Sequence, residues 1–75
     1  MKSQKRVRFE KVAAGRVDRI INLLSSLSKC SNQYNYDYDH YDVEKMFKEI
    51  KKAVSVTEDS FRQKLDSRSA GKFKF

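Results

Sequence analysis

The residue types that could support catalysis or metal binding lie around the single cysteine. Cys30 is followed ten positions later by the one histidine, His40, with Asp37 and Asp39 close by. A cysteine nucleophile needs a histidine and an orienting group, and a structural zinc site needs four ligands at closed spacing. One thiol and one imidazole complete neither set. We therefore expect no catalytic residue, no metal and no cofactor, and we predict that the protein is not an enzyme.

Basic side chains form two stripes that could bind phosphate. At 100° per residue of helix, one stripe falls within about 80° of arc and consists of Lys5, Arg8, Arg16 and Arg19. A similar row consists of Lys45, Lys48 and Lys52. Such rows can lie along a phosphate backbone and release its counterions. They are equally typical of a solvated helix face, where Glu44 and Lys48 would pair. The predicted nucleic-acid-binding residues are Lys5, Arg6, Arg8, Arg16, Arg19, Lys45, Lys48 and Lys52.

The third group of interest is a tyrosine-rich acidic segment. Residues 30–44 contain four tyrosines and four acids but no Lys or Arg. The rings could stack on nucleic-acid bases or form a protein contact, although the acids repel phosphate. Alternatively, the rings pack over the ends of the helices and enlarge a small core. The predicted partner-binding residues are Tyr34, Tyr36, Tyr38, Asp37 and Asp39.

A helix over residues 7–28 would position the first basic stripe. Apolar residues recur at steps of three or four from Phe9 to Leu27, which is the helical period. Gly15 interrupts this pattern, either as a weak point that costs about 1 kcal/mol or as a site of close helix approach. After Ser28 the pattern stops, and Asn32 is predicted to adopt the left-handed turn conformation.

A second helix over residues 39–56 would position the lysine row. Asp39 is predicted to be its N-cap, with Asp42 completing a capping box and Tyr38 packing on Val43 as a hydrophobic staple.

The end of this second helix is less well defined by the sequence. The β-branched run over residues 54–57 is a place where the helix could end, kink or restart. The polar residues that begin at Thr57 could cap a short third helix over residues 57–66.

These elements predict an all-α fold, an antiparallel two-helix hairpin with or without that third helix. The single domain would span residues 7–66, with an extended Tyr-rich connector at 29–38. Residues 1–6 and 67–75 are predicted to be flexible basic ends. Three tyrosines at alternate positions would face one way along an extended connector, covering the open end of the hairpin.

The overall composition narrows the class of protein. The 75 residues carry a net charge of +7, 39% hydrophobic residues and one cysteine. So short a chain builds only a small core, which favours a homodimer or docking onto a larger partner. No apolar run suits a membrane span or a secretory signal, so we expect a cytoplasmic protein with no membrane partner and no small-molecule substrate. Its partner is expected to be anionic.

Part of the sequence resembles a family of small helical proteins from bacterial mobile elements and phages. The resemblance covers about residues 8–61 and is carried by Arg8-Phe9, Ala13, Arg16, Cys30-Ser31-Asn32, Asn35-Tyr36-Asp37-Tyr38, Asp42-Val43, Lys45 and Phe47. It implies a two-helix body and a mobile-element setting, and it implies no particular site residue. The longer basic ends depart from the pattern.

Two functions remain open from the sequence. The first is a non-enzymatic accessory protein that binds nucleic acid or a nucleoprotein complex through the basic flank of the first helix. The second is a protein-binding inhibitor or adaptor, for example an anti-CRISPR-type inhibitor of a defence nuclease. It would use the acidic Tyr-rich turn as a phosphate mimic, or the apolar face.

Overall fold

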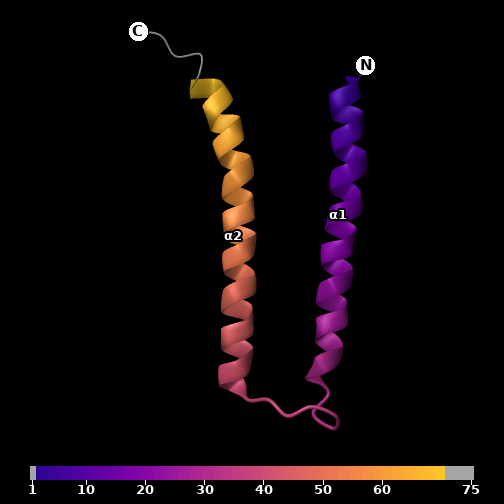
Figure 1. The fold of residues 1–75 in the computed structure, drawn as a ribbon, viewed down its shortest axis with the longest axis vertical. Coiled ribbons are helices and arrows are strands. Elements are labelled where there is room, and N and C mark those ends of the chain that lie inside the picture. The colour runs from indigo at the N-terminus through magenta and orange to yellow at the C-terminus, as the bar shows by residue number, and fades with distance from the viewer. Residues whose placement is uncertain (1, 71–75) are drawn as a thin grey trace. The chain divides into compact units, whose positions relative to one another are not determined.

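The computed structural model describes the backbone of residues 2–70 and the side chains of residues 2–67. In this part of the chain the regular structure is entirely helical: α1 (Gln4–Ser28), the short 3-10 helix η1 (Lys29–Ser31) and α2 (His40–Ala70) (Figure 1). The all-α prediction is confirmed. Residues 71–75 of the predicted flexible end lie outside the described residues. None of the described helices is long and apolar enough to cross a bilayer.

Helix α1 begins three residues before the start that the apolar pattern predicts. The Ser3 side-chain oxygen accepts a hydrogen bond from the Arg6 backbone N–H at 3.0 Å, and the Ser3 carbonyl accepts from Val7 N–H at 3.0 Å. This is an N-cap, because it satisfies amide groups that the first turn leaves without a helical partner. The helix therefore includes Gln4 to Arg6, which we had predicted to be a flexible end, and it stops at Ser28.

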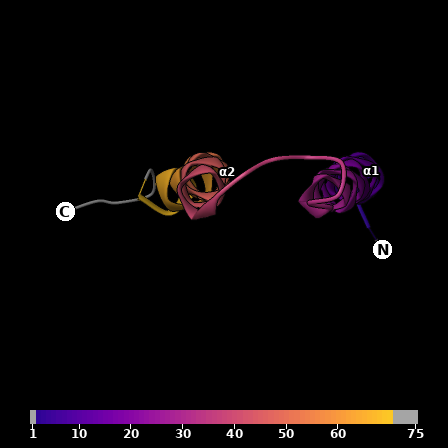
Figure 2. The same ribbon diagram turned by 90° about the horizontal axis from the view of Figure 1, so that it is seen from below.

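The connector turns through Asn32 without a left-handed residue. Asn32 has φ −69° and ψ 102°, and no non-glycine residue in the described chain has positive φ, so the left-handed prediction was wrong. Instead, its side-chain oxygen accepts from Tyr34 N–H at 2.9 Å, and its carbonyl accepts from the Asn35 and Tyr36 amides. This is an Asx-type turn, in which the Asn side chain accepts from the amide two residues on, and it forms here without a residue of positive φ. The chain then runs without helix to α2 (Figure 2).

Helix α2 begins with the predicted capping box. The Asp39 carboxylate accepts from the Asp42 backbone N–H at 2.9 Å, and the Asp42 carboxylate accepts from the Asp39 N–H at 3.0 Å. Each acid therefore satisfies one orphan amide of the first turn, and both negative charges lie near the positive end of the helix. Tyr38 and Val43, the expected staple pair, are both half-buried.

Helix α2 continues through the β-branched run, so the break considered at residues 54–57 and the separate third helix are not observed. The Thr57 hydroxyl donates to the Ala53 carbonyl at 2.8 Å, and the Ser60 hydroxyl donates to the Val56 carbonyl at 3.2 Å. Polar side chains that could favour a break thus bond to the helix itself. With no Gly or Pro between residues 40 and 70, each β-branched residue costs only about half a kcal/mol or less.

Each helix has an apolar face that nothing else among the described residues of its own part of the chain covers. The chain divides into two compact units, residues 1–37 and residues 38–75. Among the side chains described, none is fully buried. Phe9, Ile20 and Leu24 of α1 are 47%, 55% and 42% exposed, and Phe47 and Phe61 of α2 are 38% and 56% exposed. Each unit therefore carries an amphipathic helix whose apolar stripe has no partner within the unit.

Candidate nucleic-acid interface

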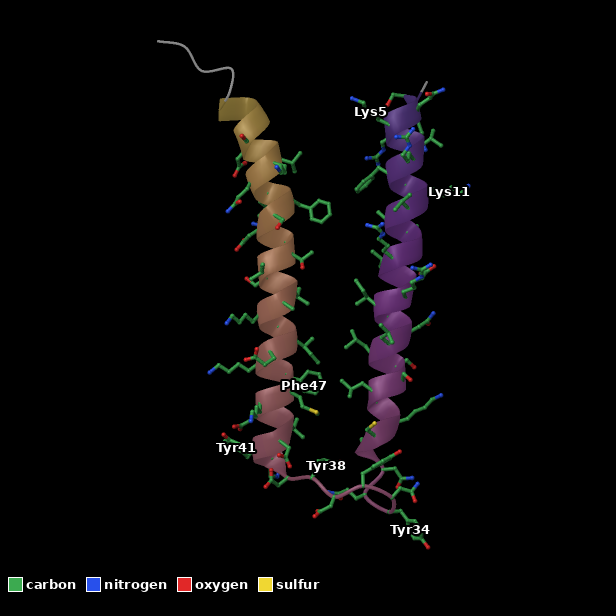
Figure 3. The ribbon with its side chains drawn as sticks, in the orientation of Figure 1. Lys5, Lys11, Tyr34, Tyr38, Tyr41 and Phe47 are labelled. Carbon is green, nitrogen blue, oxygen red and sulfur yellow. The ribbon has the colours of Figure 1, made fainter. Side chains whose placement is uncertain are left out.

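The strongest charge feature is a strip on α1 that we call the basic flank, formed by Lys5, Arg8, Arg16 and Arg19. At about 100° per residue the four side chains fall within about 80° of arc, and all four are exposed. None forms an ion pair with another described residue, and no acid of α1 falls within that arc. Lys5 and Lys11 project from different sides of α1 (Figure 3), so Lys11 is not part of the strip.

The basic flank also contains two apolar residues. Its length from Lys5 to Arg19 is about 21 Å at 1.5 Å per residue. Val12 and Leu23 fall within the same arc and are 43% and 69% exposed. The strip thus combines unpaired cations with methyl groups, next to the apolar face of the helix.

Arg6 does not belong to the basic flank, although it was predicted with these cations. It lies on the apolar side of α1, where its Nε is 3.0 Å from a Glu10 carboxylate oxygen and its guanidinium carbon is 5.6 Å from the Phe9 ring centroid. Its charge is therefore partly satisfied within the helix. The reason is the helical period, which rotates Arg6 by about 100° from either neighbour.

Glu10 forms ion pairs with two cations at the start of α1. Lys2 Nζ lies 2.9 Å from one carboxylate oxygen, and Arg6 Nε lies 3.0 Å from the other. The hydrogen bond from Lys2 is the largest cause that lowers the pKa of Glu10 below 4.5; desolvation opposes it, and the hydrogen bond and charge of Arg6 lower the pKa further. Glu10 is thus held ionised, and Lys2 and Arg6 are occupied by it.

The lysine row of α2 has a different setting. Lys45, Lys48 and Lys52 are exposed and lie on the side of α2 opposite its apolar stripe, about 180° away at 100° per residue. The expected Glu44–Lys48 pair does not form, and none of these lysines has an ion-pair partner among the described residues. Tyr41 and Phe47 project from different sides of α2 (Figure 3), which shows the two faces.

The tyrosine-rich segment is not a packed layer. Tyr34 projects from the turn (Figure 3) and is 95% exposed, so the expectation that the rings cover a core was wrong for this residue. Tyr34 lies in the turn over residues 33–35, so it is not part of the irregular run over residues 36–39 that contains Tyr38. Tyr36 is 52% exposed and Tyr38 is half-buried.

The acids of this segment have different roles. Asp39 is committed to the α2 cap, whereas Asp37 is exposed and forms no hydrogen bond or ion pair with a described residue. Asp42 is the other capping residue. Two of the four carboxylates that could imitate phosphate are therefore engaged with backbone amides.

The cysteine and the histidine lie on different elements, one in each unit of the chain. Cys30 is an exposed free thiol in η1, and His40 is the first residue of α2. Within residues 2–67, no three His, Cys, Asp or Glu side chains gather in a way that could hold a metal ion.

Sequence reasoning missed the start of α1. The signal was present: Ser3 stands three residues before Arg6 at a helix N-terminus, and Glu10 follows Arg6 by one helical turn. The apolar pattern begins only at Val7 and Phe9, so a search guided by apolar spacing places the helix start too late.

The described residues define a small, basic, all-α protein with unpaired cations along both helices. Comparison of the chain with protein-family models, with curated proteins and with solved structures finds no match in any of the three. The resemblance to mobile-element proteins therefore remains a prediction.

Proposed function

We propose that the protein binds nucleic acid through the basic flank of α1. The observation that carries this proposal is that Lys5, Arg8, Arg16 and Arg19 share one exposed strip without an acid and without an ion-pair partner among the described residues. Cations that have no carboxylate to satisfy them favour an anionic partner. The forked guanidinium of arginine is well suited to phosphate.

The chemistry of the strip favours backbone binding over base reading. Its length of about 21 Å corresponds to about six base-pair steps of duplex at 3.4 Å each. The strip has no Asn or Gln to read adenine, and we expect its lysine and arginines to contact mainly phosphates, which carry little sequence information. Lys45, Lys48 and Lys52 on α2 are a second cationic surface that could support binding to a larger nucleic acid or nucleoprotein complex.

We further propose that α1 and α2 pack as an antiparallel hairpin. The apolar residues of α1 read backwards have the same spacing as a stripe of α2 read forwards, which is apolar apart from Thr57, with steps of 3, 4, 3, 4 and 4. The matched series are Leu27, Leu24, Ile20, Val17, Ala13 and Phe9 against Val43, Met46, Ile50, Ala53, Thr57 and Phe61. The two residues of each matched pair are equally far in sequence from Asn35, which lies in the turn. Isolated helices are marginal in water, so a partner with matching spacing is a strong reason to pack.

The setting that we propose is a non-enzymatic accessory protein of a mobile element or phage, acting in the cytoplasm. This rests on the resemblance of residues 8–61 and on the basic composition. Neither observation identifies the nucleic acid, so affinity is to be measured for both duplex and single-stranded DNA.

The second candidate is the protein-binding inhibitor. It is favoured by the 95% exposure of Tyr34 beside the unpaired Asp37. The capping roles of Asp39 and Asp42 weaken its phosphate-mimic form. Asp37→Lys tests it without disturbing the α2 cap, and loss of partner binding in that variant alone would favour the inhibitor.

The proposed nucleic-acid binding is tested by charge reversal inside and outside the basic flank. Arg16→Glu with Arg19→Glu changes the basic flank, and Lys11→Glu with Lys29→Glu makes the same charge change outside it. We expect the first pair to reduce affinity for a fluorescent DNA duplex or single strand by at least about tenfold, and the control pair to reduce it much less.

Salt dependence adds a second measure. Four phosphate contacts predict a slope of log affinity against log salt of about −3.6 for duplex, and of about −2.8 for a single strand. Arg16→Gln should reduce the duplex slope by about 0.9. Affinity that does not change with salt, or equal losses in the two reversal pairs, would contradict the proposal.

A further inference from the structure

The apolar arc of α1 is wider than one neighbouring helix needs. From Val12 to Ile21 it covers about 180° at 100° per residue, whereas the arc of α2 covers about 120°. A stripe of about 100° is enough to face one core. Packing against α2 would use the middle of the α1 arc, which leaves an apolar edge on each side.

One of these edges is nearly free of charge. We call it the neutral flank, formed by Val7, Ala14, Ile21, Ser25 and Ser28. The five residues fall within about 60° of arc, roughly opposite the basic flank, and no Lys or Arg of α1 shares that arc. The single acid at this azimuth is Glu10, whose charge Lys2 and Arg6 already neutralise.

The neutral flank has the pattern of a helix–helix contact. Val7, Ala14, Ile21 and Ser28 recur every seven residues, a spacing that keeps a contact line facing a partner helix over several turns. Val7 and Ile21 are 51% and 57% exposed and alternate with small residues. Alternating large and small side chains can interdigitate between two helices. The line from Val7 to Ser28 is about 32 Å long.

We propose that the neutral flank binds the same flank of a second copy of the chain, forming a two-fold symmetric dimer. The charge distribution selects this occupant. A chain of net charge +7 repels its copies across most of its surface, and the neutral flank is the strip of α1 whose own arc contains no Lys or Arg, with Lys2 and Arg6 reaching its edge only as ion-pair partners of Glu10. A two-fold contact joins a surface to itself, so it needs a self-complementary, uncharged patch. An acidic protein partner would instead be drawn to the basic flank.

This dimer would keep both basic flanks on its outer sides. It does not depend on nucleic-acid binding, because the two surfaces lie on opposite sides of α1. The test is therefore made on the full chain without nucleic acid, by sedimentation velocity and light scattering over about 1 to 200 μM protein.

Three variants with the same added charge decide the question. Ile21→Lys and Ala14→Lys place a cation in the neutral flank, whereas Leu23→Lys places it in the basic flank on the far side of α1. Leu23 is 69% exposed and Ile21 is 57% exposed, so the control is matched in exposure and in side-chain type. Lysine is a good helix former, so the change at Ala14 leaves helix propensity nearly intact.

We expect the wild-type mass to rise from the 8.9 kDa monomer towards the dimer with concentration. Ile21→Lys and Ala14→Lys should weaken self-association at least about tenfold, because each copy would bury an unpaired charge. Leu23→Lys should retain it. Circular dichroism checks that each variant keeps its helix, and if Ile21→Lys unfolds, Ala14→Lys alone decides. A wild type that stays monomeric throughout, an Ala14→Lys variant that dimerises normally, or equal weakening by Leu23→Lys would overturn the proposal.

Discussion

At the scale of single residues, the ionisation of Glu10 makes the stability of the first turns of α1 depend on pH. Its carboxylate receives Lys2 at 2.9 Å and Arg6 at 3.0 Å, and these contacts lower the pKa of Glu10 below 4.5. A carboxylate with a lowered pKa stabilises the folded state at pH values above its ordinary pKa, and this contribution is lost as the pH falls through the lowered value. Both contacts are exposed, so the effect is local and sensitive to salt.

We therefore predict that the first two turns of α1 lose helix as the pH is lowered below about 4.5. The backbone chemical shifts of residues 4–10 measure this directly by NMR. In Glu10→Gln the same residues should be less helical at neutral pH and should lose this acid transition. Asp18→Asn is the control, because Asp18 has no ion-pair partner among the described residues and its loss should leave the transition in place. A transition that survives in Glu10→Gln would contradict this account.

At the scale of the helices, Gly15 is the weak point of α1. A Cβ placed on Gly15 would have no neighbour within 4 Å, and its φ is not positive. Of the two roles considered for this residue, the open surroundings favour the weak point over a close helix approach. Gly in a helix interior is less favourable than Ala by about 1 kcal/mol.

Gly15→Ala is predicted to stabilise α1 by about this amount, up to 1 kcal/mol, because it reduces the entropy lost on helix formation. Circular dichroism should show more helix at a given temperature and a higher melting midpoint. A loss of helix in this variant would place Gly15 against another helix and would contradict the open surroundings.

The helices also show what the sequence can and cannot predict. The apolar period locates both helices, and the Asp39–Asp42 pair locates the start of α2, because these signals are local. The path through residues 54–57 was ambiguous because β-branched residues weaken a helix only slightly. The structure shows the helix continuing through them, with the Thr57 hydroxyl bonded to the Ala53 carbonyl. The helical period separates Arg6 from the basic flank, which residue spacing already gives, whereas its bond to Glu10 is established by side-chain geometry.

At the scale of the whole molecule, the central question is what covers the two apolar stripes. Both helices expose phenylalanine and aliphatic side chains that together form an extensive apolar surface. The mirror-related spacing about Asn35 matches the α1 stripe to the α2 stripe layer by layer. A hairpin makes the stability of each helix depend on the other, whereas independent helices would respond to mutation separately.

Ile50→Asp tests this coupling from within α2. Ile50 is half-buried and lies in the proposed seam, opposite Ile20 in the matched series. Burial of one such side chain contributes about 1.5–3 kcal/mol. If the hairpin forms, amide hydrogen exchange in α1 should accelerate by about tenfold or more, since each 1.4 kcal/mol corresponds to a factor of ten. Val56→Asp adds the same charge to α2 about 120° away from Ile50 and should leave exchange in α1 nearly unchanged. Faster exchange confined to α2 in the Ile50 variant would mean that the two helices fold independently, and the hairpin would be rejected.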